Sequence, residues 1–151
     1  MFYPDFNRAF EIYTDASLVG IGAVLMQRDC KSDQLKLICC ASRPFRGGEV
    51  NYYTTKKEFL ALVWALRKFE NLVLGKKIII NTDHQALTFL LTQKHVNPML
   101  ARWVETLLEF DLEIRHVPGP ENDAADALSR QYEKWKVDRH RDPVQADVSS
   151  A

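Results

Sequence analysis

The feature that most constrains the fold of this chain is an unbroken run of isoleucines at residues 78–80, directly after a long helical pattern. β-Branched residues without polar alternation are typical of a strand buried on both faces, as in parallel pairing. The preceding segment has apolar residues at or near helical spacing, at Phe59, Leu62, Val63, Leu66 and Val73. Because a helical crossover brings a chain to a parallel neighbour, the pattern predicts an α/β domain.

Three further strand patterns precede this helix, and short polar links join them, so we expect an antiparallel meander. They span residues 10–15, 20–27 and 35–41, and the isoleucine strand spans residues 77–83. Helices are predicted at residues 84–92, 98–110 and 121–136, and an alternating strand at residues 111–116. The expected fold is a mixed five-stranded sheet, three antiparallel strands followed by parallel additions, flanked by helices.

Both ends of the long helix carry sequence signals. The phrase Thr55-Lys-Lys-Glu58 has the form of a capping box, in which the glutamate side chain reaches back to the helix start. Gly75 is a natural stop, and the lysines that follow it suit the negative end of the helix dipole. We therefore expect the helix to begin after Thr54 or Thr55 and to end before Gly75.

The 151 residues fit one globular domain. Residues 1–9 are expected to form a lead-in segment, residues 10–136 the domain, and residues 137–151 a polar, frayed tail. No apolar run approaches the roughly 20 residues that span a bilayer, and the N-terminus lacks a signal-peptide pattern. We therefore expect an intracellular protein without a membrane partner. The three cysteines fit reduced thiols in that compartment.

Two of the predicted strands end on an aspartate, Asp15 in the first strand and Asp83 in the isoleucine strand. If these strands are parallel neighbours, both carboxylates lie at one edge of the sheet, where open α/β sheets place their ligand sites. An aspartate after a strand is also a common turn residue or helix N-cap. Both interpretations stay open at this point.

Two more carboxylates are candidates for the same site. Glu58 lies in the first turn of the long helix, where the capping box explains it equally well. Asp126 lies in the last predicted helix, between two alanines, where the helix dipole also favours an acidic residue. Carboxylates from separate elements suit hard cations such as Mg²⁺, and two such ions can activate water and stabilise the leaving oxygen in phosphodiester hydrolysis.

Six short phrases occur in unbroken order over about residues 4–131. They are Tyr13-Thr-Asp-Ala-Ser17, Gly20-Ile-Gly-Ala-Val24, Ala41-Ser-Arg43, Asn51-Tyr-Tyr-Thr-Thr-Lys-Lys-Glu58, Thr82-Asp-His84 and Ala125-Asp-Ala-Leu-Ser-Arg130. Together they resemble the ribonuclease H domain of Ty3/gypsy-type LTR retrotransposon reverse transcriptases, which implies a ribonuclease H-like fold. Each phrase alone is a weak signal, but the set is specific.

The resemblance implies that Asp15, Glu58, Asp83 and Asp126 form the catalytic and metal-binding set. It also implies two Mg²⁺ (or Mn²⁺) ions and hydrolysis of the RNA strand of RNA–DNA hybrids during reverse transcription, leaving a 3′-hydroxyl and a 5′-phosphate. The implied partner besides the hybrid is an adjoining reverse transcriptase polymerase domain. The implied location is the cytoplasm, within a virus-like particle.

His116 lies ten residues before Asp126, the spacing of a mobile histidine that helps turnover in cellular ribonucleases H; a polar strand-end residue is the alternative. His84 follows Asp83, but we do not expect it to be a metal ligand. The basic helix-and-loop insertion of the cellular enzymes is missing here. With a net charge of zero, this predicts weak hybrid binding by the isolated domain. The candidate phosphate contacts are Arg43, Lys56, Lys57, Arg102 and Arg130.

Two functions from different classes stay open. The leading one is a metal-dependent endonuclease specific for RNA–DNA hybrids. The alternative is a catalytically silent domesticated or accessory domain that binds nucleic acid or protein partners. The complete carboxylate set favours the enzyme. A nucleotide-binding α/β domain has no support, because the sequence contains neither G-x-G-x-x-G nor a P-loop.

Overall fold

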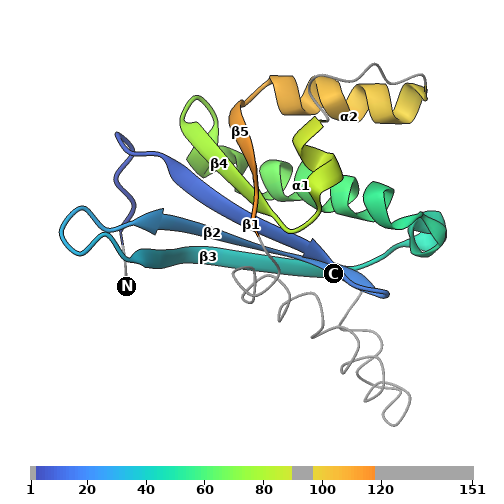
Figure 1. Ribbon diagram of the computed structural model, residues 1–151, viewed down its shortest axis with the longest axis horizontal. Helices are drawn as coiled ribbons and strands as arrows, with labels where there is room; N and C mark the ends of the chain where they lie inside the picture. Colours follow the sequence, from blue (N-terminus) through green and yellow to red (C-terminus); the bar gives the residue numbers. More distant parts are fainter. Residues whose placement is uncertain (1–2, 90–96, 118–151) are drawn as a thin grey trace, which may run out of the picture.

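The computed structural model describes residues 3–89 and 97–117 (Figure 1). Its strands are β1 (Phe10–Ala16), β2 (Gly20–Arg28), β3 (Leu35–Pro44), β4 (Lys77–Thr82) and β5 (Asp111–His116). Its helices are α1 (Thr54–Val73) and α2 (Pro98–Leu108), with the short 3-10 helices η1 (Gly47–Asn51) and η2 (Gln85–Phe89). The order of strands and helices up to β5 follows the predicted order, with η2 in place of a longer helix.

The five strands form one mixed sheet in the order β3-β2-β1-β4-β5. β1 pairs antiparallel with β2, and β2 with β3, so the predicted meander is confirmed. β4 pairs parallel with both β1 and β5, which confirms the parallel additions and the crossover through α1. The α/β fold class expected from the isoleucine run is therefore the observed one.

The register between β1 and β4 decides where the two strand-end aspartates lie. Tyr13 is opposite Asn81 in this parallel pair. Two residues after Tyr13 comes Asp15, near the end of β1, and two residues after Asn81 comes Asp83, just beyond β4. The two aspartates therefore lie at the same edge of the sheet, as the strand pattern predicts.

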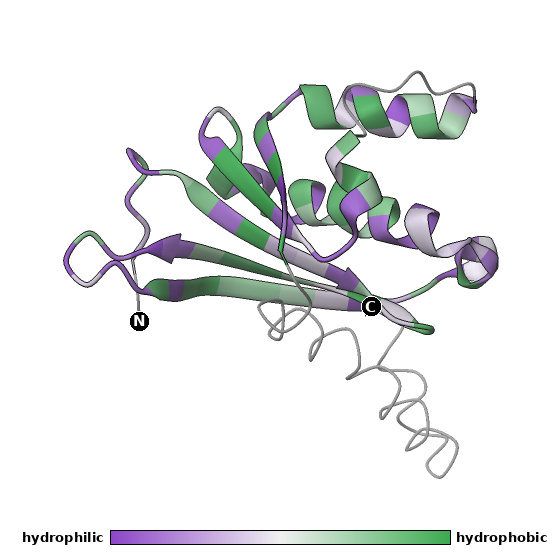
Figure 2. Ribbon diagram, viewed as in Figure 1, coloured by the Kyte–Doolittle hydropathy of each residue, from purple (hydrophilic) through white to green (hydrophobic). Residues whose placement is uncertain are grey.

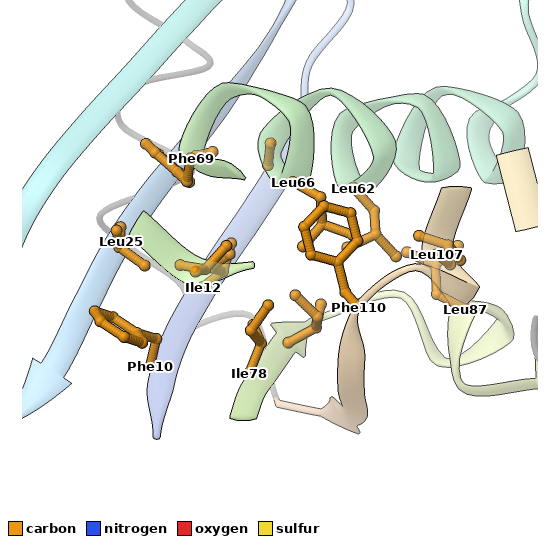
Figure 3. Packing of buried hydrophobic residues seen from close by; sticks show 14 of the residues in the cluster. Phe10, Ile12, Leu25, Leu62, Leu66, Phe69, Ile78, Leu87, Leu107 and Phe110 are labelled. Atoms are coloured by element: carbon orange, nitrogen blue, oxygen red, sulfur yellow. The ribbon is translucent and has the colours of Figure 1, made fainter. Parts of the chain in front are cut away.

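The core lies between α1 and the sheet (Figure 3). Leu62, Leu66 and Phe69 of α1 pack in one cluster with Ile12 of β1 and Leu25 of β2. Figure 2 shows α1 alternating between hydrophobic and hydrophilic residues along its length, as expected for a helix that buries one face. Each fully buried large apolar side chain contributes about 1.5–3 kcal/mol, so this face of α1 fixes the helix on β1 and β2.

The isoleucine strand behaves nearly as predicted. Ile78 and Ile80 of β4 have no exposed surface and join the core under α1, while Ile79 on the opposite face is half-buried. β4 is flanked by β1 and β5, so it has no free edge in the sheet. The run therefore marks a central strand that is covered fully on one face and partly on the other.

The capping box predicted for α1 is wrong. The helix begins at Thr54, its N-cap is Tyr53, and no side chain caps it. Glu58 is therefore the fifth helical residue, too far along the helix to reach the first N–H groups. Its carboxylate instead accepts a hydrogen bond from the backbone N–H of Ala16 in β1, at 3.3 Å. The predicted stop at Gly75 agrees with the structure, since α1 ends at Val73 and Gly75 has a φ of +79°.

Other predicted boundaries shift or lie outside the described residues. In place of the helix predicted from residue 84 to residue 92, the structure has η2 up to residue 89, and the rest of that range is not described. β3 extends three residues beyond its predicted end at residue 41, and α2 ends two residues before its predicted end at residue 110. The predicted helix at 121–136 and the tail at 137–151 lie outside the described residues.

Candidate active site

Three carboxylates from three different elements meet at the edge of the sheet. One oxygen from each of Asp15, Glu58 and Asp83 lies within 4.8 Å of the other two. Asp15 comes from β1, Glu58 from α1, and Asp83 from the link between β4 and η2. Within residues 3–89 and 97–117, this is the one group of three or more His, Cys, Asp or Glu side chains placed closely enough to share a metal ion.

The three carboxylates have different surroundings. Asp15 and Glu58 are only 5% and 4% exposed, whereas Asp83 is exposed. Burial, together with the neighbouring Asp15 and Asp83 charges, raises the pKa of the Glu58 carboxyl to about 9, against the hydrogen bond from Ala16. In the absence of a cation, Glu58 is therefore protonated at neutral pH.

The cluster fits a hard divalent cation. Buried Oε2 of Glu58 has no hydrogen-bond partner among the described residues. Leaving a buried polar atom without a partner costs free energy unless another ligand satisfies it. The donors on offer are carboxylate oxygens, which Mg²⁺ and Mn²⁺ prefer over nitrogen or sulfur ligands. A cation here would also offset the repulsion between the acidic groups.

Two histidines lie beside Asp83, although neither belongs to the carboxylate group. His84 Nε2 is 2.9 Å from the hydroxyl of Thr55 in α1. The ring of His116, at the end of β5, donates from Nε2 to the backbone carbonyl of Asp83 at 3.2 Å. The sequence interpretation missed Thr55 in this role. The one signal for it is its position three residues before Glu58, which places both on one face of α1.

The candidate phosphate contacts are arranged unequally. Lys56 lies over the ring of Tyr52, with its ammonium 4.0 Å from the ring centre, and Lys57 lies over Phe45 at 5.1 Å. Arg43 is instead engaged by Glu49, to which its two terminal nitrogens donate at 2.8 and 3.2 Å. Its guanidinium fork is therefore already paired with a carboxylate.

The remaining predicted residues are less informative. Arg102 is an exposed residue of α2. Asp126 and Arg130 lie outside the described residues, so the structure places three of the four predicted carboxylates. No helix within the described residues is long and apolar enough to cross a membrane.

The fold and its acidic cluster define the class of the domain as ribonuclease H-like. A family model described as the RNase H-like domain found in reverse transcriptase matches residues 5–110, which is most of the chain. The chain therefore belongs to the family of RNase H-like domains of reverse transcriptases. This confirms the resemblance carried by the six sequence phrases.

Relatives with known context are retrotransposon polyproteins. The chain is 43% identical, over 130 residues, to the retrovirus-related Pol polyprotein from transposon gypsy of Drosophila melanogaster, covering 85% of this chain and 12% of that protein. It is 36% identical, over 132 residues, to the transposon Tf2-3 polyprotein of Schizosaccharomyces pombe, covering 83% of this chain and 10% of that protein. The chain thus spans about a tenth of the length of these relatives.

Solved structures with the same fold include cellular and viral proteins. RNase H1 from Halobacterium salinarum matches with a TM-score of 0.57 and 20% identity, over 80% of this chain and 92% of that one. The foamy viral protease-reverse transcriptase in complex with dsDNA matches with a TM-score of 0.62 and 19% identity, over 77% of this chain and 25% of that one. At these identities the likeness establishes the fold alone.

Proposed function

We propose that this domain is a metal-dependent endonuclease that hydrolyses the RNA strand of RNA–DNA hybrids during reverse transcription. The observation that carries the proposal is the convergence of Asp15, Glu58 and Asp83, with a buried oxygen of Glu58 left without a partner among the described residues. Family membership supports it, as does the fold shared with LC11-RNase H1, solved in complex with an RNA/DNA hybrid (TM-score 0.56, 16% identity, 80% of this chain and 91% of that one).

In this proposal Asp15, Glu58 and Asp83 hold the metal, and Asp126 supplies a fourth carboxylate. Two bound Mg²⁺ (or Mn²⁺) ions would supply an activated water and stabilise negative charge on the leaving oxygen. The protein groups set the conditions for this chemistry. Asp15 and Glu58 are fixed by β1 and α1, and Glu58 gives up the proton on its carboxyl when it becomes a ligand.

Lys56 and Lys57 are the best-placed candidates to contact the hybrid. Both lie on α1 directly before Glu58, so a phosphate held there lies close to the carboxylates. Their ammonium groups rest on Tyr52 and Phe45, which limits the freedom that each side chain loses on binding. Arg43 ranks behind them because Glu49 already occupies its guanidinium.

The test is cleavage of a hybrid that carries separate labels on its RNA and DNA strands, in Mg²⁺. We expect the wild type to cut the RNA strand only, Asp83→Asn to abolish cutting, and Asp111→Asn to cut like the wild type. Asp111 is a matched control because it is an exposed aspartate at the start of β5, at the opposite end of the strand from His116. Equal cutting by wild type and Asp83→Asn would overturn the proposal.

We also propose that a reverse transcriptase polymerase domain adjoins this one and that both act in the cytoplasm, within a virus-like particle. The short share of the polyprotein relatives that the chain covers supports the first part. If the isolated domain is inactive, cleavage should be measured again with the polymerase portion attached. Inactivity in both forms, with no calorimetric response to millimolar Mg²⁺, would favour the alternative of a silent accessory domain.

A further inference from the structure

We propose that His84 and His116 are positioning residues, which hold the backbone around Asp83 so that its carboxylate stays within reach of Asp15 and Glu58. This inference rests on the proposed function of the site. It differs from the two roles considered for these histidines on sequence grounds, a metal ligand for His84 and a mobile turnover group for His116. Both side chains instead make hydrogen bonds that end at, or next to, residue 83.

Asp83 is the member of the cluster that needs such support. Asp15 lies within β1, and Glu58 lies within a twenty-residue helix, so the main-chain hydrogen bonds of regular elements fix both. Asp83 lies beyond the last residue of β4, before the short helix η2 begins, and its side chain is exposed. Links of this kind open more readily than the elements they connect.

The first tether joins residue 84 to α1. The hydroxyl of Thr55 and Nε2 of His84 lie 2.9 Å apart in a partly buried setting, and either can donate, depending on the tautomer of the ring. Thr55 and Glu58 are three residues apart on one helix face. The tether therefore connects the neighbour of Asp83 to the same helix turn that carries Glu58. The backbone N–H of His84 also donates to the hydroxyl of Thr82 at 3.1 Å.

The second tether comes from the opposite side, from β5. A carbonyl oxygen can only accept, so Nε2 of His116 must carry the hydrogen that it donates to the Asp83 carbonyl at 3.2 Å. Thr82, the residue before Asp83, is held from the same side, because the backbone N–H of Val117, just after β5, donates to the Thr82 carbonyl at 2.7 Å. The His116 bond is exposed and longer than the Thr55–His84 contact, so we expect it to contribute less.

Groups that orient a metal ligand without touching the ion typically change metal affinity by about 10- to 100-fold when they are removed. We therefore expect Thr55→Val to weaken binding of Mn²⁺ by about tenfold, measured by calorimetry on the whole domain without nucleic acid. Thr54→Val is the matched control, since Thr54 is the adjacent, exposed threonine in the same helical turn. Equal affinities in the two variants would overturn the tether through Thr55. The tether would also be overturned if Thr55→Val, but not Thr54→Val, lowered the Tm of the metal-free domain enough for unfolding to explain the weaker Mn²⁺ binding.

The glutamine variants separate positioning from proton transfer. A glutamine amide can donate from nearly the position of Nε2 but cannot titrate. We expect His116→Ala to weaken Mn²⁺ binding severalfold and His116→Gln to restore most of the lost affinity. At position 84 we expect a larger loss of affinity in His84→Ala, and again a recovery of most of it in His84→Gln. Failure of both glutamine variants to restore affinity would overturn the proposal. Loss of turnover in both His116 variants, with unchanged Mn²⁺ affinity, would favour the mobile-histidine role instead.

One measurement keeps this inference separate from the proposed function. Amide hydrogen exchange of the metal-free domain reports opening of the β4–η2 link directly, at the N–H groups of His84 and Leu87. We expect faster exchange at both amides in Thr55→Val than in Thr54→Val. If the wild type binds no Mn²⁺ but this difference is present, the proposed function falls and the tether stands. Equal exchange rates would overturn the tether whatever the activity.

Discussion

The two sides of the carboxylate cluster are built in different ways. On the buried side, Asp15 and Glu58 belong to β1 and α1, and the core that fixes these elements also removes water from the carboxyl groups. On the exposed side, Asp83 remains in contact with solvent, and side chains from α1 and β5 hold its backbone. Burial therefore gives one side its position, and a few hydrogen bonds give the other side its position.

This difference has a physical cost on each side. A buried carboxylate is rigid but resists ionisation, because the protein interior solvates charge poorly. An exposed carboxylate is well solvated, but Asp83 lies in a link outside the regular strands and helices, where the backbone opens more readily. The cluster therefore combines two buried carboxyl groups with one that is exposed to solvent.

The largest effect should come from the buried side. We expect Glu58→Gln to lower the rate of hybrid cleavage in Mg²⁺ by about 10²–10³-fold, the range seen when one electrostatic stabiliser of a transition state is removed. The amide keeps an oxygen that can accept from Ala16 but loses the charge that holds a cation. Single-turnover cleavage assays measure the effect. Glu105→Gln, at an exposed position of α2, is the matched control and should cut at the wild-type rate.

The same substitution should also change how the stability of the metal-free protein depends on pH. At high pH the wild type should lose stability, and Glu58→Gln should lose less. The pKa of Glu58 is about 9 in the folded protein, against 4.5 for an unperturbed glutamate, so between these values the folded state binds one proton more than the unfolded state. The stabilising contribution of the protonated carboxyl is full below about pH 4.5 and is lost as the pH rises through 9.

We therefore expect the free energy of unfolding of the wild type, with a chelator present, to fall by about 2 kcal/mol more than that of Glu58→Gln between pH 7 and pH 9. Urea denaturation at each pH measures this difference, and the comparison cancels other titrating groups that both proteins share. Parallel pH profiles in the two proteins would mean that Glu58 is ionised in the metal-free fold, and that burial and repulsion do not hold its proton.

A third prediction follows for the cation itself. Because Glu58 must lose its proton to become a ligand, binding of Mn²⁺ at pH 7 should release close to one proton. Calorimetric titrations in buffers of different ionisation enthalpy measure the number released. The Asp111→Asn control should release the same number, and Glu58→Gln should release none in any residual binding. Binding without proton release in the wild type would show that the cation bypasses Glu58.

The fold could be predicted because its signals are local and periodic. The isoleucine run and the helix before it together indicated a parallel crossover, and the observed register then brought Asp15 and Asp83 to one edge. Glu58 could not be assigned by the same means. Its capping box was judged from a four-residue phrase, whereas α1 begins two residues earlier than that phrase requires. A hydrogen bond from Ala16 on β1 engages the carboxylate instead.

The tethers were beyond prediction for a related reason. Thr55 and His84 are 29 residues apart in the chain, and Asp83 and His116 are 33 apart. A single side-chain hydrogen bond over such a separation leaves no periodic pattern in the sequence. The same holds for Gln27, a fully buried glutamine on β2 whose side chain bonds both the N–H and the carbonyl of Asp5 in the lead-in segment, each at 2.7 Å. Glutamine is usually exposed, and the two hydrogen bonds to the backbone of Asp5 explain why this one is buried.

The smallest expected effect concerns the surface beside the buried side. If Lys57 contacts a phosphate of the hybrid, Lys57→Ala should make the negative slope of log K against log salt concentration less steep by about 0.9. It should also weaken binding equally for all sequences. Binding is measured in the Asp83→Asn background, so that the hybrid stays intact. Lys68→Ala is the matched control, because Lys68 is an exposed lysine nearer the other end of α1. Equal slopes for Lys57→Ala and Lys68→Ala would remove Lys57 from the hybrid interface and leave its ammonium as a structural contact of Phe45.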